Sequence, residues 1–479
     1  MNSPLLTDLY QLTMACGYWK LGLHDRKAVF HHIFRKHPFG GNYAVTAGLA
    51  SVVAFLRDWH FSSADLAYLE TLQAPAGGPL FPAAFLAYLG QLRFSCDVDA
   101  IPEGTLVFPH EPLLRITGPL LQGQLLETAL LDLVNFQTLI ATKAARVCQA
   151  ASGDAVLEFG LRRAQGPDGG LSASRAAYIG GCEASSNVLA GQQFGIPVSG
   201  THAHSWVTVF DDESAAFDAF AETSPANFVL LVDTYDTRRG VQNAIQTAKK
   251  MREKGVELRA IRLDSGDLAV LSQDARAALD AAGFQNVAII ASNSLDEYVI
   301  ASLKKQGAKI SIWGVGTNLV TAYDHPALDG VYKLSALQNE QGQWEHRLKL
   351  SEQAEKVSNP GILQVRRYFQ AGVPVADVIY DELTGISADP AWVTLTAPHG
   401  VHAVQSFDDC QDVLQPLFRG GQQVVTLPDI HTVRANCLGA VSDFAGRHGE
   451  ADYAVGLEKT LHESKQQRVT ALRLEYALR

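Results

Sequence analysis

The chain has 479 residues, of which 47% are hydrophobic and 19% charged, so it is long and apolar enough to bury at least one large core. Its formal net charge of −11 argues against general binding to nucleic acid or acidic membranes and favours small-molecule partners. Six cysteines without a Cys-x-x-Cys pair, and the absence of a basic leader or a long uncharged apolar stretch, predict a cytoplasmic protein with reduced thiols and no membrane span.

The two ends of the chain differ in pattern from its middle. Residues 1–140 predict a separate α/β domain, with apolar helices near 46–59 and 120–150 and a strand-like stretch at 103–120 that is punctuated by glycine and proline. Residues 371–479 contain short strands and a helical finish at 456–478. We expect this C-terminal extension to pack near the N-terminal domain.

Residues 141–370 show a repeating rhythm of short apolar runs, each followed by a stretch with helical periodicity. Such continuous apolar strands, alternating with helices, indicate a parallel sheet. An open doubly wound sheet and a closed β/α barrel both fit. Polar residues at the end of every run favour an irregular or incomplete TIM-like barrel, because ligand groups come from all around a barrel's rim. The runs lie at 155–160, 196–201, 228–237, 257–267, 287–294 and 309–317.

The first of these runs leads into the segment "EFGLRRAQGPDGG" at 158–170. Phe159 offers a flat face to an aromatic ring, and the adjacent Arg162 and Arg163 match a carboxylate or phosphate in bidentate geometry. The alternative is a surface loop with solvated arginines.

Two later runs end in mixed acids and arginines. Carboxylates can hold a hydrated magnesium ion while arginines hold phosphate oxygens, so these ends predict a site for a magnesium-bound polyphosphate. Asp264 or Asp267 is the predicted magnesium contact, and structural salt bridges are the alternative. The residues concerned are Asp233, Asp236, Arg238 and Arg239 in the first set, and Arg262, Asp264 and Asp267 in the second.

The last two runs end in small residues that let backbone N–H groups approach an anion, as expected for a phosphate monoester site. These residues are Ser292, Asn293, Gly314 and Gly316. The chain has no Gly-x4-Gly-Lys-Ser/Thr sequence, so any use of a nucleotide is not of the P-loop kind.

The segment "SGTHAHSWV" at 199–207 places His202 and His204 two residues apart. A zinc hydrolase would need further histidines on later strand ends, and those ends carry none. A histidine facing a phosphate-lined cavity can be an acid or base, a cation for phosphate, or a nucleophile that accepts a phosphoryl group. The spacing does not choose among these roles.

Six segments together resemble the nicotinate phosphoribosyltransferases, type II phosphoribosyltransferases of NAD salvage. The resemblance implies an irregular β/α barrel beside an α/β domain, in a homodimer with shared active sites. It also implies a reaction of nicotinate with 5-phosphoribosyl 1-pyrophosphate (PRPP) that needs Mg²⁺ and uses ATP as co-substrate through a phosphohistidine, giving nicotinate mononucleotide and pyrophosphate. The segments are "TDLYQLTMA", "EFGLRRAQGPDGG", "GGCEASSNVLAG", "SGTHAHSWV", "RLDSGDL" and "KVSNPG".

By this resemblance His204 is the phosphorylated residue and His202 a neighbour. Tyr10, across the dimer interface, and Phe159 would sandwich the pyridine ring, although a core aromatic on a helix face is the alternative for Tyr10. Arg162 would meet the carboxylate or phosphates, and Arg262 and Asp264 the ribose and pyrophosphate. The other implied substrate contacts are Thr201 and Ser186, with Ser292, Asn293, Gly314 and Gly316 at the 5′-phosphate.

Three rival functions share parts of this pattern. Nicotinamide phosphoribosyltransferase places an acid where Ser186 aligns, and a serine beside arginines suits a carboxylate better. Quinolinate phosphoribosyltransferase uses no phosphohistidine, so "THAHS" and the long N-terminal domain speak against it. A catalytically silent PRPP- or nucleotide-sensing protein is disfavoured because the strand-end acids and arginines are intact.

Overall fold

The computed structural model describes residues 3–353, 356–387, 391–395, 400–404, 407–449 and 453–477. Its internal contacts divide the chain into two compact units. Unit 1 contains Met1–Thr138, Ala327–Asp429 and Gly439–Arg479, and unit 2 contains Leu139–Pro326 and Ile430–Leu438. The predicted boundary at residue 140 lies close to the break after Thr138. The next break follows Pro326 and not residue 370, and most of the C-terminal extension groups with the N-terminal residues.

Unit 1 is built on mainly antiparallel sheets, in which β15 and β21 form a parallel pair. Across the described residues, its largest sheet has seven strands in the order β13-β12-β1-β5-β3-β19-β20. Central β1 is buried from Ala28 to Ile33, and Phe30 stacks on Tyr332 of β12 with ring centroids 5.0 Å apart. The strands are β1 (Lys27–Ile33), β3 (Asp97–Ala100), β5 (Pro112–Pro119), β12 (Val331–Gln338), β13 (Trp344–His346), β19 (Gln415–Arg419) and β20 (Gln422–Gln423).

A second sheet of unit 1 has the described order β17-β16-β21-β15-β14-β18, and β2 (Ala44–Val45) pairs separately with β4 (Leu106–Val107). A buried ion pair joins Arg367 of β14 to Asp377 of β15 at 2.6 Å. The predicted helical finish starts as β21 before α16, and Leu478 lies outside the described residues. The bounds are β14 (Leu363–Gln370), β15 (Val373–Asp381), β16 (Ala391–Thr394), β17 (Val401–Ala403), β18 (Asp409–Asp412), β21 (Ala454–Glu458) and α16 (Lys459–Ala477).

The predicted apolar helix near 46–59 is confirmed as α2, and the one at 120–150 is divided into α5 and α6. Helix α3 begins at a capping box, in which the Ser62 hydroxyl accepts from the Asp65 N–H and the Asp65 carboxylate accepts from the Ser62 N–H. The described helices that belong to unit 1 wholly or in part are α1 (Leu9–Lys20), η1 (Pro38–Gly40), α2 (Leu49–Arg57), α3 (Ser63–Thr71), α4 (Ala83–Gln91), α5 (Leu120–Leu125), α6 (Glu127–Ala151) and α15 (Ile430–His448).

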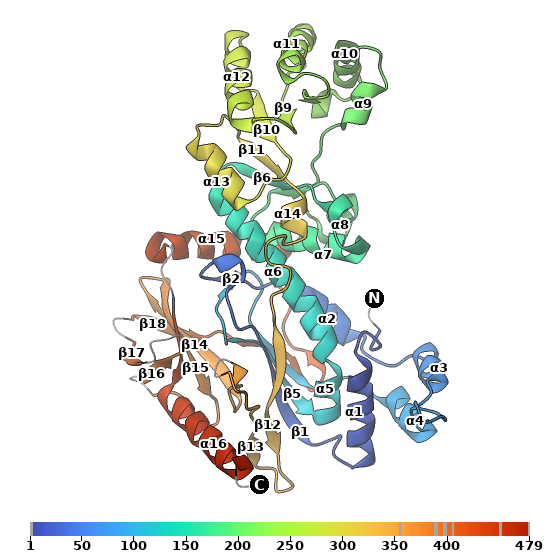
Figure 1. Cartoon of the computed structure of the whole chain (residues 1–479), viewed down its shortest axis with the longest axis vertical. Helices are drawn as coiled ribbons and strands as arrows, with labels where there is room; N and C mark the ends of the chain where they lie inside the picture. The colour runs from blue at the N-terminus through green and yellow to red at the C-terminus, as the bar shows by residue number, and fades with distance from the viewer. Residues whose placement is uncertain are drawn as a thin grey trace. The chain divides into compact units, whose positions relative to one another are not determined.

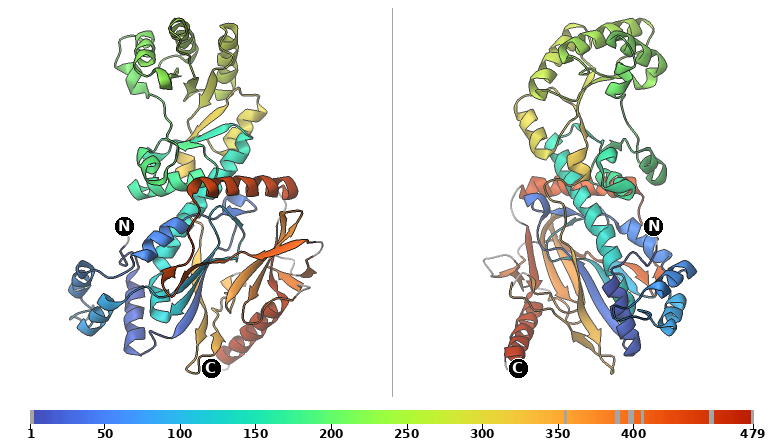
Figure 2. Two further views of the ribbon diagram at one scale, coloured as in Figure 1. Left: turned by 180° about the vertical axis from the view of Figure 1, so that it is seen from behind. Right: turned by 45° about the vertical axis from the view of Figure 1, so that its right-hand side comes forward.

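Unit 2 contains the parallel sheet that the apolar runs predict. Residues 139–326, all of them described, form one sheet in the order β7-β6-β11-β10-β9-β8. Figures 1 and 2 show three helices along its outer side, α11 (Thr237–Glu253), α12 (Leu268–Ala281) and α13 (Glu297–Lys305). Five predicted strands are confirmed, each shorter than its apolar run. The strands are β6 (Ala155–Glu158), β7 (Ala184–Ser185), β8 (Val229–Leu231), β9 (Ala260–Leu263), β10 (Ala288–Ala291) and β11 (Ile312–Val315).

The sheet of unit 2 is an open half-barrel. Strands β7 and β8 are its two edges and do not pair with each other within 139–326, so the barrel is not closed there. The predicted strand at 196–201 is wrong. This segment makes only an isolated bridge between Val198 and Ser185, and its proline, which lacks an N–H, and its glycine both weaken a strand.

Helices of unit 2 begin at a recurring type of residue. An aspartate side chain accepts backbone N–H groups at the start of four helices, which satisfies donors that the first turn leaves free. These N-caps are Asp212, Asp236, Asp267 and Asp296. The helices that lie wholly in unit 2 are η2 (Leu161–Arg163), α7 (Gly166–Ile179), α8 (Val188–Phe194), α9 (His204–Thr208), α10 (Glu213–Thr223), η3 (Pro225–Asn227), α11 (Thr237–Glu253), α12 (Leu268–Ala281), α13 (Glu297–Lys305) and α14 (Thr317–Val320). None of the described helices combines the length and the hydropathy that a membrane span requires.

Candidate active site

The carboxyl ends of the parallel strands in unit 2 bring together most of the predicted site residues. Because parallel strands share one carboxyl edge, side chains that follow β6, β8, β9, β10 and β11 lie close to one another. The segment that leads into α9 supplies two more groups to the same network. The residues that meet there are Phe159, Thr201, His204, Asp233, Thr234, Arg262, Asp264, Ser292 and Gly314.

Arg262 holds the centre of this network. Its Nε donates to the Ser292 hydroxyl at 2.8 Å, Nη1 to the Thr201 hydroxyl at 2.9 Å, and Nη2 to Asp264 Oδ1 at 2.9 Å. Its guanidinium carbon also lies 5.7 Å from the centroid of the Phe159 ring, within cation–π range. Three fixed hydrogen bonds orient this cation, so a negatively charged ligand meets a preorganised guanidinium.

Asp264 stays ionised beside this cation. Burial by itself raises its pKa, but hydrogen bonds from Ser292 and Arg262, the charge of Arg262 and the nearby His204 outweigh burial, so the net pKa lies below the ordinary value. The other carboxylate oxygen, Oδ2, lies 3.7 Å from His204 Nε2. Asp264 is therefore a carboxylate at neutral pH that faces both an arginine and a histidine.

The two histidines of His-x-His have different surroundings, because the chain turns into α9 at His204. His202 is 8% exposed, and its Nε2 accepts the Leu231 N–H at 3.1 Å, which leaves the ring proton on Nδ1 next to the Ala203 carbonyl oxygen. Burial lowers the pKa of His202, so it is a neutral core residue. The His204 side chain is 43% exposed, and its Nδ1 lies 3.2 Å from the Thr234 hydroxyl.

Phe159 packs against the end of β11, at two positions where glycine leaves room for it. A Cβ at position 314 would be 2.7 Å from Phe159 Cδ2 and 2.9 Å from Cε2, closer than real side chains approach. A Cβ on Gly316 would meet the Phe159 carbonyl oxygen at 3.2 Å. Both glycines thus make room for Phe159, and their predicted contact with a 5′-phosphate stays a prediction.

Glu158 is a buried carboxylate that the sequence analysis did not single out. It is 0% exposed, and it accepts hydrogen bonds from the Gly160 N–H, from the Ser174 hydroxyl at 2.8 Å and from the Ser185 hydroxyl at 2.6 Å. These three donors belong to the loop after β6, to α7 and to β7. The signal in the sequence was a charged residue at the end of an apolar strand, inside the quoted motif "EFG".

The groups predicted for the substrate carboxylate have different surroundings. The Ser186 N–H donates to the Glu158 carbonyl oxygen at 2.9 Å, and the Ser186 side chain is half-buried. Arg162 and Arg163 are exposed on the turn η2, as the alternative of a solvated loop allows. Their predicted roles in binding an anion stay predictions.

The backbone after β10 is strained. Asn293 has φ 85° and Ser294 has φ 49°, a left-handed conformation that non-glycine residues seldom adopt. Strain of this kind is held in place by surrounding structure and is frequent at ligand-binding sites. The Asn318 side chain donates to the Ser294 carbonyl oxygen at 3.3 Å, which ties this turn to α14.

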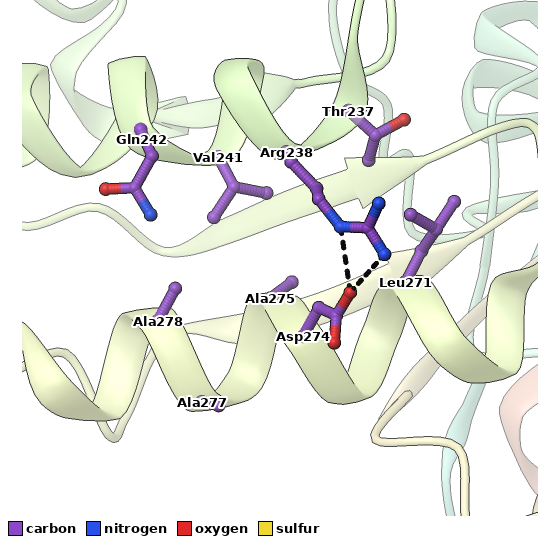
Figure 3. A pocket seen from close by; sticks show the side chains of 9 residues that line it. All are labelled: Thr237, Arg238, Val241, Gln242, Leu271, Asp274, Ala275, Ala277 and Ala278. Carbon is purple, nitrogen blue, oxygen red and sulfur yellow. Dashed lines mark hydrogen bonds and ion pairs between the residues drawn. The ribbon is translucent and has the colours of Figure 1, made fainter.

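Two residues of the predicted polyphosphate set serve other purposes. Asp236 caps α11, and Arg238 forms an ion pair with Asp274 of α12 at 2.8 Å. The pair lines a cavity of about 260 Å³ between α11 and α12 (Figure 3), and His204, Arg262 and Asp264 are not among its lining residues. Arg238 is thus paired with Asp274 in this structure, and its predicted role as a phosphate ligand stays a prediction.

Two acids are available for magnesium, Asp264 and Asp233. Of these, Asp233 was not among the predicted magnesium contacts. Asp267 caps α12, where its Oδ1 accepts the N–H groups of Ala269 and Val270 at 3.1 Å. Asp233 Oδ2 accepts from the Asp264 N–H at 3.0 Å and from the Ser265 hydroxyl, whereas its buried Oδ1 has no hydrogen-bond partner in the described structure. A half-used carboxylate beside Asp264 fits a hydrated Mg²⁺, which needs only one or two protein carboxylates.

The described part of the chain contains no group of three or more His, Cys, Asp or Glu side chains placed to hold a metal ion. A magnesium ion that keeps most of its waters does not need such a group.

Tyr10 belongs to unit 1, where it lies on α1 with 50% of its surface exposed. The neighbouring Gln11 is buried and donates to Glu127 at 3.0 Å, and Gln124 donates to Gln11 at 2.5 Å. These contacts fix α1 while Tyr10 faces outwards. Tyr10 is therefore not a core aromatic, and its predicted place on the pyridine ring stays a prediction.

Comparisons with known proteins identify the family of this chain. Residues 5–135 match the family model described as nicotinate phosphoribosyltransferase (NAPRTase) N-terminal domain, and 155–348 match the NAPRTase family model. The nicotinate phosphoribosyltransferase of Bacillus subtilis is 50% identical over 364 residues, which cover 76% of this chain and 72% of that protein. The chain belongs to the nicotinate phosphoribosyltransferase family. The predicted resemblance to these enzymes is thus confirmed.

Solved structures extend the likeness over nearly the whole chain. The crystal structure of human nicotinic acid phosphoribosyltransferase has a TM-score of 0.82 at 34% identity and covers 96% of this chain and 99% of that one. Nicotinate-nucleotide pyrophosphorylase from Pyrococcus furiosus has a TM-score of 0.69 at 24% identity, covers 91% and 95%, and supports the fold alone. Together these likenesses support a mixed α/β fold with a parallel half-barrel.

Proposed function

We propose that the protein joins nicotinate to PRPP, giving nicotinate mononucleotide and pyrophosphate for NAD biosynthesis, and that it couples this reaction to ATP hydrolysis through His204. The observation that carries the proposal is the fixed set of His204, Asp264 and Arg262 at the strand ends of a chain in this family. The substrates in this proposal are small anions, which the arginine at the centre of the site suits.

Arg262 and Asp264 act on PRPP in this proposal. As the C1–O bond of PRPP breaks, its electron pair leaves with pyrophosphate and the ribose gains oxocarbenium character, so a guanidinium held by three hydrogen bonds stabilises the departing charge. The nicotinate ring nitrogen then forms the bond to C1. Asp233 and Asp264 would hold Mg²⁺, which supplies further positive charge to the pyrophosphate oxygens.

His204 supplies the link to ATP. An imidazole nitrogen attacks the γ-phosphorus of ATP, the bond to the bridging oxygen breaks and ADP leaves; water later cleaves the N–P bond and releases inorganic phosphate. The added negative charge lies next to Arg262 and the magnesium carboxylates, so it can change the affinity for PRPP and pyrophosphate. His204 is suited to this step because its ring is exposed, whereas that of His202 is buried.

The pyridine ring is proposed to stack on Phe159, with Tyr10 on its other face, while Arg162 and Ser186 meet the carboxylate. We expect Phe159→Ala to raise the Michaelis constant for nicotinate about tenfold or more, because a stacked aromatic face contributes roughly 1–3 kcal/mol. Steady-state kinetics with nicotinate varied and PRPP saturating measure this effect. An unchanged Michaelis constant for nicotinate would remove Phe159 from the ring site.

The whole assignment is tested by one assay. Purified protein is incubated with nicotinate, nicotinamide or quinolinate, each with PRPP and magnesium, with and without ATP. We expect product from nicotinate alone, at a rate that ATP increases. Product from nicotinamide or quinolinate would overturn the substrate, and product from none of them would favour a silent binding protein.

Several finer predictions belong to the same proposal. The half-barrel of unit 2 is proposed to be an irregular TIM-like barrel, and the protein to be a cytoplasmic homodimer in which Tyr10 of one subunit completes the site of the other. The exposed position of Tyr10 on α1 supports that last point. Sedimentation of the purified protein measures the oligomeric state, and complementation between Tyr10→Ala and His204→Ala subunits tests the shared site.

A further inference from the structure

We propose that Thr234 is a positioning residue that fixes the orientation of the His204 imidazole, a role that rests on the proposed phosphorylation of His204. The Thr234 hydroxyl oxygen lies 3.2 Å from His204 Nδ1, on the side of the ring opposite Asp264. Thr234 follows β8 and is half-buried, so its hydroxyl is directed by the strand end and not by a mobile surface chain.

The contact with Thr234 decides which ring nitrogen is free. The nitrogen that attacks phosphorus must keep its lone pair, so we assign the ring proton to Nδ1, where the Thr234 hydroxyl oxygen at 3.2 Å accepts it. Nε2, which lies 3.7 Å from Asp264 Oδ2, then keeps its lone pair for the attack on the γ-phosphorus. Without this hydroxyl, nothing at Nδ1 in this network would hold the ring in that orientation.

The structure also fixes Thr234 relative to Asp264. The residue before it, Asp233, accepts from the Asp264 N–H at 3.0 Å and from the Ser265 hydroxyl. These bonds join the turn after β8 to the turn after β9, so the groups on the two sides of the His204 ring move together. Threonine adds stiffness here, because its branched Cβ restricts rotation about the first side-chain bond.

A matched set of variants separates the hydroxyl from its shape. Thr234→Val keeps the branched side chain and removes the hydroxyl, while Thr234→Ser keeps the hydroxyl on a smaller side chain. Thr223→Val is the control, since Thr223 is exposed and its hydroxyl donates to the Ala219 and Phe220 carbonyl oxygens of its own helix, α10. Each full-length variant is incubated with γ-labelled ATP and magnesium, and the acid-labile label on histidine is followed with time.

We expect Thr234→Val to form phosphohistidine about tenfold to a hundredfold more slowly, as small errors of orientation cost in this range. Its Michaelis constant for ATP should change little, and the ATP stimulation of nicotinate mononucleotide synthesis should fall with the labelling rate. Thr234→Ser should recover most of the rate, and Thr223→Val should match the wild type in labelling and in melting temperature.

His204→Ala makes the failures distinguishable. Label on histidine in that variant at the wild-type rate would overturn the proposed role of His204 itself. No label in His204→Ala, together with wild-type labelling of Thr234→Val, would overturn the positioning role and leave His204 in place. An equal loss of labelling rate in Thr234→Val and Thr234→Ser would also overturn the positioning role, because the hydroxyl would then not be the group that determines the rate.

Discussion

Replacing His204 by alanine is expected to abolish ATP stimulation while slow PRPP-dependent synthesis of nicotinate mononucleotide persists. The imidazole is the proposed acceptor of the γ-phosphoryl group, whereas Arg262 keeps its hydrogen bonds to Ser292 and Thr201 in the variant. Because coupling between two sites is typically worth 1–3 kcal/mol, we expect ATP to lose a stimulation of roughly five- to 150-fold. The initial rate with and without ATP, at fixed PRPP and nicotinate, measures this ratio.

His202→Ala serves as the comparison. His202 accepts the Leu231 N–H and packs on Phe220 with ring centroids 4.7 Å apart, so its loss leaves a buried donor without a partner and removes a core contact. We expect that variant to have a lower melting temperature but to keep its ATP stimulation. Equal ATP stimulation in His204→Ala and in the wild type would exclude the phosphohistidine.

Replacing Glu158 by alanine is expected to destabilise unit 2 by roughly 2–4 kcal/mol, because the buried Gly160 N–H and two serine hydroxyls lose their acceptor. The same change releases the loop that carries Phe159, so the Michaelis constant for nicotinate should rise as well. Thermal unfolding and nicotinate kinetics measure the two effects.

Two variants bracket the result for Glu158. Glu158→Gln keeps one acceptor oxygen and should lose less stability than Glu158→Ala. Glu183→Ala changes an exposed carboxylate that follows α7, and it should stay within about 0.5 kcal/mol of the wild type, as surface substitutions usually do. A melting temperature of Glu158→Ala equal to that of Glu183→Ala would show that the buried hydrogen bonds do not stabilise the unit.

Local pattern predicts the strands of unit 2 well, and it fails where long-range geometry decides. Strands β6 and β8 to β11 are buried on both faces, so each has an apolar run that can be recognised in the sequence. Strand β7 has only two residues, which is too short for any periodicity. Whether the sheet closes depends on how its edges meet, and no short segment carries that information.

Within the site, residue type predicted position better than role. Asp236 and Asp267 follow apolar strands just as Asp233 and Asp264 do, yet the first two cap helices. An aspartate directly before a helical stretch is an N-cap signature, and applying it to both segments would have separated the two kinds of acid. Glu158 was missed because nothing local shows that the donors of Ser174 and Ser185 meet at one carboxylate.

The close approach of Gly314 to Phe159 has a consequence for how the family can vary. A side chain at position 314 would collide with the Phe159 ring in its present place. A residue larger than glycine at 314 therefore requires a change at 159. In a set of homologues, alanine or serine at position 314 should therefore be accompanied by a residue smaller than phenylalanine at position 159. The two positions are then inherited as a pair, and drift at one is constrained by the other although 154 residues of chain lie between them.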